Sequence, residues 1–443
     1  MPLLADPITS TPRVPAQADV VIIGGGIVGV FATLTAAKAG HSVALVEKGV
    51  VGGEQSSRNW GWVRQQNRDP REIPMAMESL AMWETLSAET NEDLGFRRKG
   101  LIYVTRDQAT LATWERWGQL ARPFGVDTRM LSAAEARSMA TGTADAWIGG
   151  VHSPTDGRAE PSLAAPAIAR AAMRLGASIV ENCAARGLEM TAGRVSGVVT
   201  EQGTIRTPSV VLAGGAWASM FLRHHGVSLP QASIRATSFR TAPLPEVVTG
   251  GLSTPKFTLR RRLDGGYTIG LSGRGRLDLA PQGIRHARQF WPMFMDRRDK
   301  LAIRLGRSFF DGPEALARWS LDSTSPFERN RIWDPAPQPS LIEEALVAME
   351  ETYPGLKGQI RVAQSWGGAI DWTPDGIPVI APIAKIPGLV VAAGFSGHGF
   401  GTGPSAGKLA ADLATGATPS IDPAPFRHER LIDGTKLTVP GMI

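Results

Sequence analysis

The clearest hydrophobic pattern of the chain lies between residues 18 and 48. Four β-branched residues at 20–23 form a short apolar run, which is typical of a strand buried on both faces of a parallel sheet. A glycine turn and an apolar helical segment follow, and residues 42–46 form a second apolar run. This order of strand, helix and strand predicts a βαβ unit.

The turn of this unit carries the spacing G-x-G-x-x-G at Gly24, Gly26 and Gly29. The first glycine permits a tight turn, the second lets the backbone approach a pyrophosphate, and the third lets helix and strand pack closely. The helix N-terminus offers free N–H groups and a positive dipole end to the anion. Glu47 ends the second strand, where an acid accepts hydrogen bonds from ribose hydroxyls and disfavours NADP. We therefore predict a bound dinucleotide.

The later patterns predict a second region with its own strands and helices. A helix is expected over 70–94, a strand over 100–105 and a helix over 107–124, and Ser132 with Glu135 has the spacing of a capping box. From residue 229 to about 346 the pattern changes to alternating strands, with a hairpin turn at 264–265.

The composition of the chain argues against several kinds of site and classes of protein. Cys183 is the single cysteine of the 443 residues, so an internal disulfide and a cysteine cluster for zinc or iron–sulfur are excluded, and a reducing compartment is expected. The first 17 residues lack the apolar core of a signal peptide, and no apolar run is long enough to span a membrane. The net charge of +6 comes from scattered basic residues, which favours anionic substrates or an anionic membrane surface over nucleic acid.

Two distant motifs carry a resemblance to a known family. The loop at 53–58 reads GEQSSR, and the C-terminal region contains WGG at 366–368, TPDG at 373–376 and GFSGHGF at 394–400. From about residue 18 to 416 the chain resembles the FAD-dependent D-amino acid oxidase superfamily. The first motif is similar to a loop of bacterial amino-acid deaminases and dehydrogenases, and the second to the segment that closes the FAD site of sarcosine, glycine and D-amino acid oxidases.

The resemblance implies that the dinucleotide is FAD. A second glycine turn at 214–215 and the glycine-rich loop at 394–401 also suit the longer FAD molecule better than NAD. Because no cysteine precedes TPDG, FAD is expected to be noncovalent. The residues expected to bind it are Gly24, Gly26, Ile27, Val28, Gly29, Glu47, Lys48, Gln55, Ser56, Ser57, Arg58, Ala185, Ala213, Gly214, Trp217, Gly397, His398, Gly399, Gly401 and Thr402.

The resemblance also implies the fold class and domain organisation. We expect an α/β protein with a Rossmann-like FAD-binding domain of the glutathione-reductase type, interleaved with an α+β substrate domain built on an antiparallel sheet. The FAD-binding domain is predicted to comprise 17–94, 147–225 and 350–420. The substrate domain is predicted at 95–146 and 226–349, followed by a tail at 421–443.

The implied activity is oxidation of a C–N bond in an amino acid or secondary amine. The catalytic candidates are Arg64, Arg260, Trp366 and His398. Arg64 matches an arginine that binds the substrate carboxylate in sarcosine oxidases, and Arg260 is the weaker anchor. Two other anchors of the family are missing, because Ile370 and Gly401 replace an arginine and a lysine. His398 is interpreted as a hydrogen-bonding group near the flavin rather than as a base.

Several alternatives stay open at this stage. Electrons pass from FAD either to oxygen or to a membrane quinone. The basic amphipathic segment 289–310 lies on a membrane surface or packs on the sheet, and Pro292 and Gly306 favour packing. A cytoplasmic location is expected, with peripheral contact at the inner face of the membrane as the other possibility. A 2-hydroxy-acid dehydrogenase and a noncatalytic FAD-binding subunit are the alternative functions.

Overall fold

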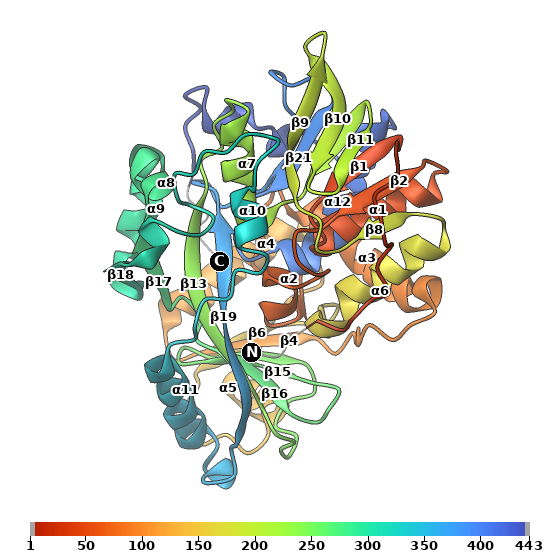
Figure 1. The fold of residues 1–443 in the computed structure, drawn as a ribbon. Coiled ribbons are helices and arrows are strands. Elements are labelled where there is room, and N and C mark those ends of the chain that lie inside the picture. Colours follow the sequence, from red (N-terminus) through yellow and green to blue (C-terminus); the bar gives the residue numbers. More distant parts are fainter. Residues whose placement is uncertain (1–4, 439–443) are drawn as a thin grey trace.

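The structure is a computed structural model that describes residues 5–438. Residues 1–4 and 439–443 lie outside the described residues, so the end of the predicted tail is not described. Two large sheets, each made from several separate stretches of the chain, form the body of the molecule (Figure 1).

The first sheet has six strands in the order β20-β21-β12-β1-β2-β8. Its members are β1 (Val20–Ile23), β2 (Val43–Val46), β8 (Ser178–Val180), β12 (Ser209–Leu212), β20 (Val379–Pro382) and β21 (Leu389–Ala393). Strand β1 pairs in parallel with both β12 and β2, and every residue of β1 and β2 is buried. This arrangement confirms the βαβ unit predicted from the apolar runs.

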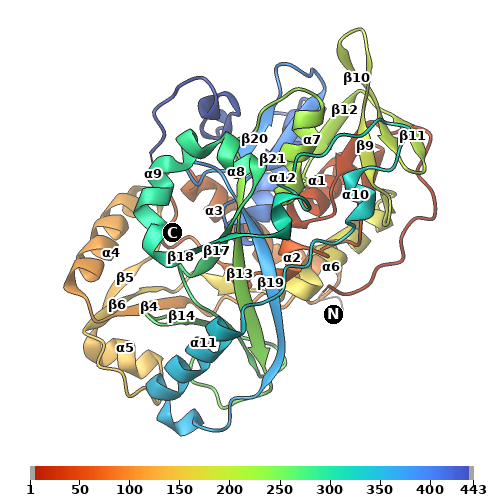
Figure 2. The same cartoon turned by 60° about the vertical axis from the view of Figure 1, so that its left-hand side comes forward.

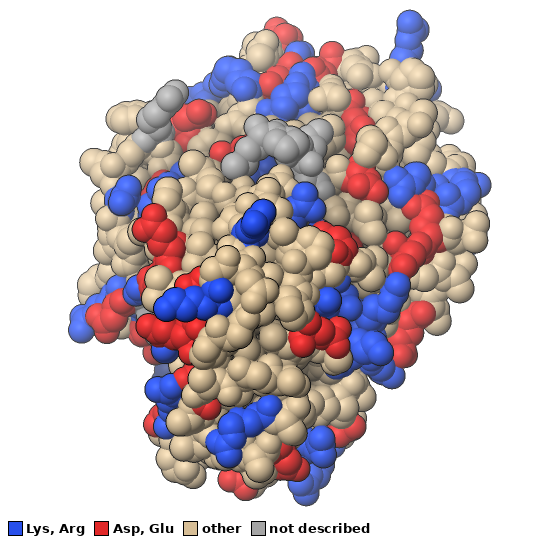
Figure 3. Space-filling model, turned by 90° about the horizontal axis from the view of Figure 1, so that it is seen from below, with Lys and Arg blue, Asp and Glu red and all other residues tan. Residues whose placement is uncertain are grey.

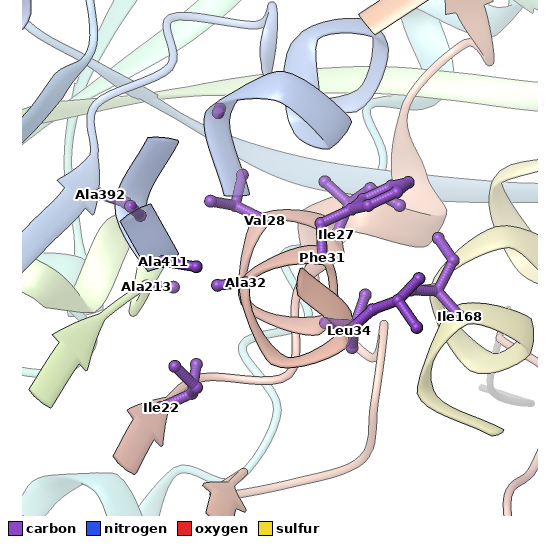
Figure 4. Close-up of a cluster of buried hydrophobic side chains, with 14 of the residues drawn as sticks. Ile22, Ile27, Val28, Phe31, Ala32, Leu34, Ile168, Ala213, Ala392 and Ala411 are labelled. Atoms are coloured by element: carbon purple, nitrogen blue, oxygen red, sulfur yellow. The ribbon is translucent and has the colours of Figure 1, made fainter. Parts of the chain in front are cut away.

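Helices cover one face of this sheet and a small sheet covers the other. The helices are α1 (Ile27–Lys38), α3 (Ile73–Thr90), α6 (Pro161–Arg174) and α12 (Gly399–Thr415), and the small sheet contains β9 (Ala185–Thr191), β10 (Arg194–Thr200) and β11 (Gly203–Arg206). Figure 4 shows α1 inside the apolar core of the helical face, between Ile168 of α6 and Ala411 of α12. Helices α1 and α12 touch closely, since a Cβ atom at Gly407 would lie 2.6 Å from the carbonyl oxygen of Val28.

The second sheet has ten strands and contains the longest ladder of the protein. Its strands are β4 (Leu101–Thr105), β5 (Arg129–Ser132), β6 (Gly149–Ser153), β13 (Ala232–Thr241), β14 (Gly251–Ser253), β15 (Thr258–Arg261), β16 (Tyr267–Gly270), β17 (Gly275–Leu279), β18 (Leu301–Leu305) and β19 (Val362–Trp372). Strands β13 and β19 run antiparallel along almost their whole length. Because of this ladder and the pairing of β6 with β4, β6 and β19 belong to the second sheet, although the predicted boundaries at 147 and 350 assign them to the FAD-binding domain.

Shorter elements surround the two sheets. They are α2 (Gln55–Arg58), β3 (Trp62–Val63), α4 (Gln108–Ala121), α5 (Ala133–Met139), β7 (Gly157–Arg158), α7 (Ala218–His224), α8 (Pro281–Arg285), α9 (Ala287–Arg297), α10 (Pro326–Arg329) and α11 (Pro339–Thr352). Helix α5 begins at Ser132 with the predicted capping box. The predicted hairpin at 264–265 joins the antiparallel strands β15 and β16.

Segment 289–310 lies at the periphery, where α9 and the edge strand β18 protrude beside β17 (Figure 2). Met293 is the buried residue of α9, and β18 pairs with β17. Segment 289–310 therefore packs on the sheet only in part. Its apolar side chains Trp291, Leu305 and Phe310 are 58%, 70% and 84% exposed. None of the helices in residues 5–438 is long and apolar enough to cross a membrane.

The charges visible in Figure 3 have both signs intermixed over that face of the molecule. This distribution matches the scattered basic residues of the sequence. Within the described part of the chain, three or more His, Cys, Asp or Glu side chains nowhere come together in a group that could hold a metal ion.

Candidate functional site

The predicted glycine turn lies between β1 and α1, where the backbone packs too closely for side chains. Gly24 has a φ of +109°, and a Cβ atom there would lie 2.4 Å from the carbonyl oxygen of Ala213. A Cβ atom at Gly29 would lie 1.9 Å from the carbonyl oxygen of Gly24. The glycines thus bring the N-terminus of α1 against the end of β12, as a nucleotide-binding turn requires.

A cleft opens at this turn. The predicted cofactor residues that line it are Gly24, Gly26, Glu47, Lys48, Gln55, Ser56, Ala185, Ala213, Gly214 and Trp217. Residues that are distant in the sequence therefore meet around one cavity.

Glu47 connects the two loops at the mouth of this cleft. Its two carboxylate oxygens accept hydrogen bonds from the N–H groups of Gly25 and Gly49, each at 2.7 Å. Burial raises the pKa of this carboxyl, while Lys48 and the two N–H donors oppose the rise. Each oxygen keeps a further lone pair, so Glu47 can still accept a ribose hydroxyl.

Two acidic residues of the cleft were missed by sequence reasoning. Glu54 accepts hydrogen bonds from Lys48 Nζ at 2.5 Å and from the indole N–H of Trp217 at 3.2 Å. Asp371 accepts from the N–H of Gly394 at 2.8 Å, and burial raises its pKa to about 6. Glu54 lies within the GEQSSR motif and was not singled out, whereas Asp371 enters the cleft only because β19 pairs with β13.

The cleft also has the free polar groups that a dinucleotide needs. No side chain caps α1 at Gly26, so the start of this helix faces the cleft with its N–H groups, of which Ile27 donates to Ser56 Oγ at 2.8 Å. The side-chain oxygen Oε1 of Gln55 is buried without a hydrogen-bond partner. An anion-binding helix end, the glycine cradle and an unsatisfied acceptor fit a dinucleotide phosphate and its sugars.

The other predicted cofactor residues lie beside the cleft rather than on its lining. Ile27, Val28 and Gly29 form the first turn of α1, and Gly397, His398, Gly399, Gly401 and Thr402 form the start of α12 and the loop before it. In α2, Ser57 is buried and Arg58 forms an ion pair with Asp334 and donates to the carbonyl of Gly367. Arg58 is therefore held by protein groups.

His398 caps α12 and is buried against a carboxylate. Its Nδ1 lies 3.1 and 3.2 Å from the two oxygens of Glu72, which is itself fully buried. Burial and the nearby Arg68 lower the pKa of His398 to about 4. At neutral pH the imidazole is therefore neutral, with its proton on Nδ1 facing Glu72, and its buried Nε2 has no hydrogen-bond partner.

Arg64 lies on the loop that touches the start of α12. A Cβ atom at Gly401 would lie 3.2 Å from the carbonyl oxygen of Trp62, so this loop packs closely against the first turn of α12. The guanidinium of Arg64 donates to Tyr103 Oη at 2.8 Å and to the carbonyl of Gln66 at 3.2 Å. Among residues 5–438, no carboxylate lies within ion-pair distance of Arg64.

Arg68, which the sequence did not single out, lies next to Arg64. It is 3% exposed, its Nη1 has no hydrogen-bond partner, and burial lowers its pKa to about 10, so it stays charged at neutral pH. The loop between the two arginines is held by Asp156, which accepts the N–H groups of Gln65 and Gln66. Burial raises the pKa of Asp156 to about 6.

Arg260 and Trp366 line a separate cavity with Ser57. Both terminal nitrogens of Arg260 donate to Glu160, at 2.8 and 3.1 Å, and its Nε donates to the carbonyl of Trp60 at 2.5 Å. The guanidinium of Arg260, the weaker expected anchor, is thus paired with a buried carboxylate. Trp366 donates from its indole N–H to the carbonyl of Arg58 at 2.9 Å.

This chain is similar to known proteins over most of its length. A family model described as DAO, FAD dependent oxidoreductase, matches residues 19–413. The chain belongs to this family. It is 26% identical over 426 residues to a glycine oxidase of Pseudomonas putida, covering 93% of this chain and 98% of that protein. It is 31% identical over 224 residues to the mitochondrial sarcosine dehydrogenase of Mus musculus, covering 49% of this chain and about a quarter (24%) of that longer protein.

A solved structure shows the same architecture. The L-amino acid deaminase of Proteus myxofaciens in complex with anthranilate matches with a TM-score of 0.92 and 29% identity, covering 96% of each chain. These findings confirm the predicted family and an α/β fold with mixed sheets. The DAO-family protein is thus an enzyme of the FAD-dependent amino acid or amine oxidase and dehydrogenase kind.

Proposed function

We propose that this enzyme oxidises the C–N bond of an amino acid or secondary amine to an imine, which water hydrolyses to an oxo product. The observation that carries the proposal is a half-buried arginine, Arg64, which has no carboxylate partner among the described residues and lies against the start of α12. A substrate carboxylate is the partner such a guanidinium lacks. The deaminase structure that matches this fold holds anthranilate, an aminocarboxylate, which supports a substrate with the same two groups.

The residues around Arg64 have separate tasks in this proposal. Tyr103 holds the guanidinium through its phenolic oxygen, and Trp62 lies against it, 5.8 Å from ring centre to Cζ. Arg68 adds a second positive charge behind the loop. The two cations favour an anionic ligand beside this loop, and the buried carboxylates of Glu72 and Asp156 offset part of the charge of Arg68.

His398 and α12 supply the polar surroundings of the reaction. The neutral His398 presents a lone pair at Nε2, but a pKa of about 4 makes it too weak to remove a proton from a substrate ammonium group. The substrate is therefore expected to react as the neutral amine, held in place by its carboxylate. The N-terminal dipole of α12 stabilises negative charge at its start. Noncovalent FAD, held by the glycine turn at Gly24 and by the loop before α12, would supply the hydride acceptor for the α-carbon of the substrate.

The electron acceptor is either oxygen or a membrane quinone. The exposed apolar side chains of 289–310, together with Arg288, Arg298 and Arg304, supply a surface that can meet an anionic bilayer. Flotation with vesicles of anionic or zwitterionic lipid checks this surface. Binding to anionic vesicles alone supports the quinone acceptor, and failure to float with either favours oxygen.

Anaerobic mixing of the holoenzyme with candidate substrates tests the reaction itself. We expect amino acids or secondary amines to bleach the visible absorption of the bound flavin. Bleaching by 2-hydroxy acids instead would replace C–N oxidation by C–O oxidation. If no compound of either class bleaches the flavin until a partner protein is added, the chain is an FAD-binding subunit.

A further inference from the structure

Residues 326–334, which we call the strap, lie against one side of the cofactor cleft and contribute one residue to its lining. The strap follows the second sheet's edge strands in the sequence and begins with α10. Phe327 lines the cleft beside Phe221 and Ala185. Phe327 and Trp333 both make edge-to-face contacts with Trp217, with ring centres 5.8 and 6.4 Å apart. The strap thus covers the end of the cleft that Glu47 marks as the ribose side.

Three ion pairs tie the strap to three different elements around the cleft. Arg186 of β9 donates to both oxygens of Glu328 at 2.8 and 2.9 Å, and this contact lowers the pKa of Glu328 to about 2. Arg331 donates to both oxygens of Glu201 at 2.6 Å. The third pair joins Asp334 to Arg58 of α2. Two-point arginine–carboxylate contacts of this kind hold geometry more strictly than single contacts.

The strap also lies directly on the loop that follows β2. Lys48 Nζ donates to the carbonyls of Asn330 and Arg331, each at 2.9 Å, and Arg331 donates back to the carbonyl of Lys48 at 2.9 Å. The N–H of Trp333 donates to Glu54 at 2.8 Å. A Cβ atom at Gly49 would lie 2.4 Å from the carbonyl oxygen of Arg331, so the two backbones are in contact.

We propose that the strap is part of the FAD site and retains the adenosine half of the cofactor. The strap connects the second sheet to the walls of the cleft, and its ties must break before this end of the cleft opens. The rate at which noncovalent FAD dissociates is therefore limited by the rate at which the strap moves away from the cleft. The inference rests on FAD as cofactor, which the family shows, and not on the substrate proposed above.

The release of FAD from the holoenzyme tests this role without any turnover. After dilution into an excess of an unrelated apoprotein that binds FAD tightly, the transfer of FAD to that apoprotein gives a rate constant for release. Since salt screens ion pairs, we expect wild-type release to accelerate at least fivefold between 0.05 and 1 M NaCl. A rate that does not change with salt would overturn an ionic strap.

Variants that lack ion pairs of the strap test whether these pairs slow FAD release. Arg331→Gln combined with Glu328→Gln removes two of the ion pairs and is expected to speed release at least tenfold and to flatten its salt dependence. The matched control is Arg274→Gln, which breaks an exposed pair with Glu344 away from the cleft. Release at the control rate from the double variant would contradict the proposal.

Gly49→Ala probes the same contact without changing charge. Its methyl group must push the strap away from the loop after β2, so FAD release should again be faster than in wild type. Gly283→Ala is the control, because an added Cβ there meets no atom within 4 Å. A purified wild-type protein that takes up no FAD would refute the cofactor itself, whereas FAD-loaded variants with wild-type release rates would refute only the strap.

Discussion

The two ends of the site differ in how their residues are brought together. At the nucleotide end, Gly24, Gly29 and Glu47 all lie within residues 20–47, in or directly after one βαβ unit. Backbone packing fixes the two glycines, and two backbone hydrogen bonds fix Glu47. At the proposed substrate end, Arg64 and His398 come from distant parts of the chain, which the packing of Gly401 against residues 62–64 brings together. The nucleotide end is therefore built from residues close together in the sequence, and the substrate end depends on tertiary contacts.

Because of this difference, we expect the two ends to respond differently to substitutions. Close backbone contacts make the nucleotide end intolerant of any added atom, whereas hydrogen bonds and charge govern the substrate end. Substitutions at the first end should therefore destroy folding or cofactor binding. Substitutions at the second should change pH dependence and substrate affinity while the fold persists.

Gly29→Ala has the largest expected effect. The added methyl group would sit 1.9 Å from the carbonyl oxygen of Gly24, so the turn and α1 cannot both keep their positions. We expect no FAD-loaded, folded protein on gel filtration with absorbance detection. Gly355→Ala, which meets open space, is the control and should give normal holoenzyme. A normally loaded Gly29→Ala protein would refute the packing described for this turn.

Arg260→Ala is expected to have the next largest effect, and on stability alone. It removes the two-point partner of the buried Glu160 and leaves only Arg262, at 3.6 Å, as a nearby cation. Breaking a buried pair of this kind costs about 3 to 5 kcal/mol of the free energy of unfolding. Denaturant unfolding measures the loss, and the KM for substrate should stay at the wild-type value. A raised KM with unchanged stability would return Arg260 to the substrate site.

His398 should make stability depend on pH. Its pKa is about 4 in the folded protein and 6.5 when exposed, so below pH 6.5 the unfolded chain binds a proton that the folded chain refuses. The stabilisation is complete above pH 6.5 and is lost as the pH falls to about 4, by about 3 kcal/mol. Relative to His398→Gln, wild-type protein should lose that much in denaturant unfolding across this interval. Parallel pH profiles for the two proteins would exclude a neutral, buried His398.

Arg64→Ala should have the smallest effect in energy and the most specific one. Loss of a charge-assisted contact is expected to cost about 2 kcal/mol of binding free energy, which raises the KM for an anionic substrate about 30-fold. Arg116→Ala on the surface of α4 is the control and should leave KM unchanged. Steady-state kinetics on the same substrate compares the two variants, and an unchanged KM in Arg64→Ala would remove it from the site.

The sequence was sufficient for the parts of the fold that depend on local pattern. The βαβ unit, the capping box at Ser132 and the hairpin at 264–265 were all predicted, because period, spacing and turn residues act over a few positions. The pairing of Arg260 with Glu160 was not predicted, since the two residues lie 100 positions apart and only the fold brings them together. Arg68, Asp371 and Phe327 were missed for the same reason.

Binding of an unreactive carboxylate to the holoenzyme tests the central claim most directly, because it joins the two ends of the site in one signal. Benzoate titrated into the FAD-loaded protein should perturb the visible flavin spectrum, and Arg64→Ala should need about 30-fold more benzoate for the same change. Equal benzoate affinities for the two proteins, or no spectral change in wild type, would contradict a carboxylate site formed by Arg64 beside the flavin.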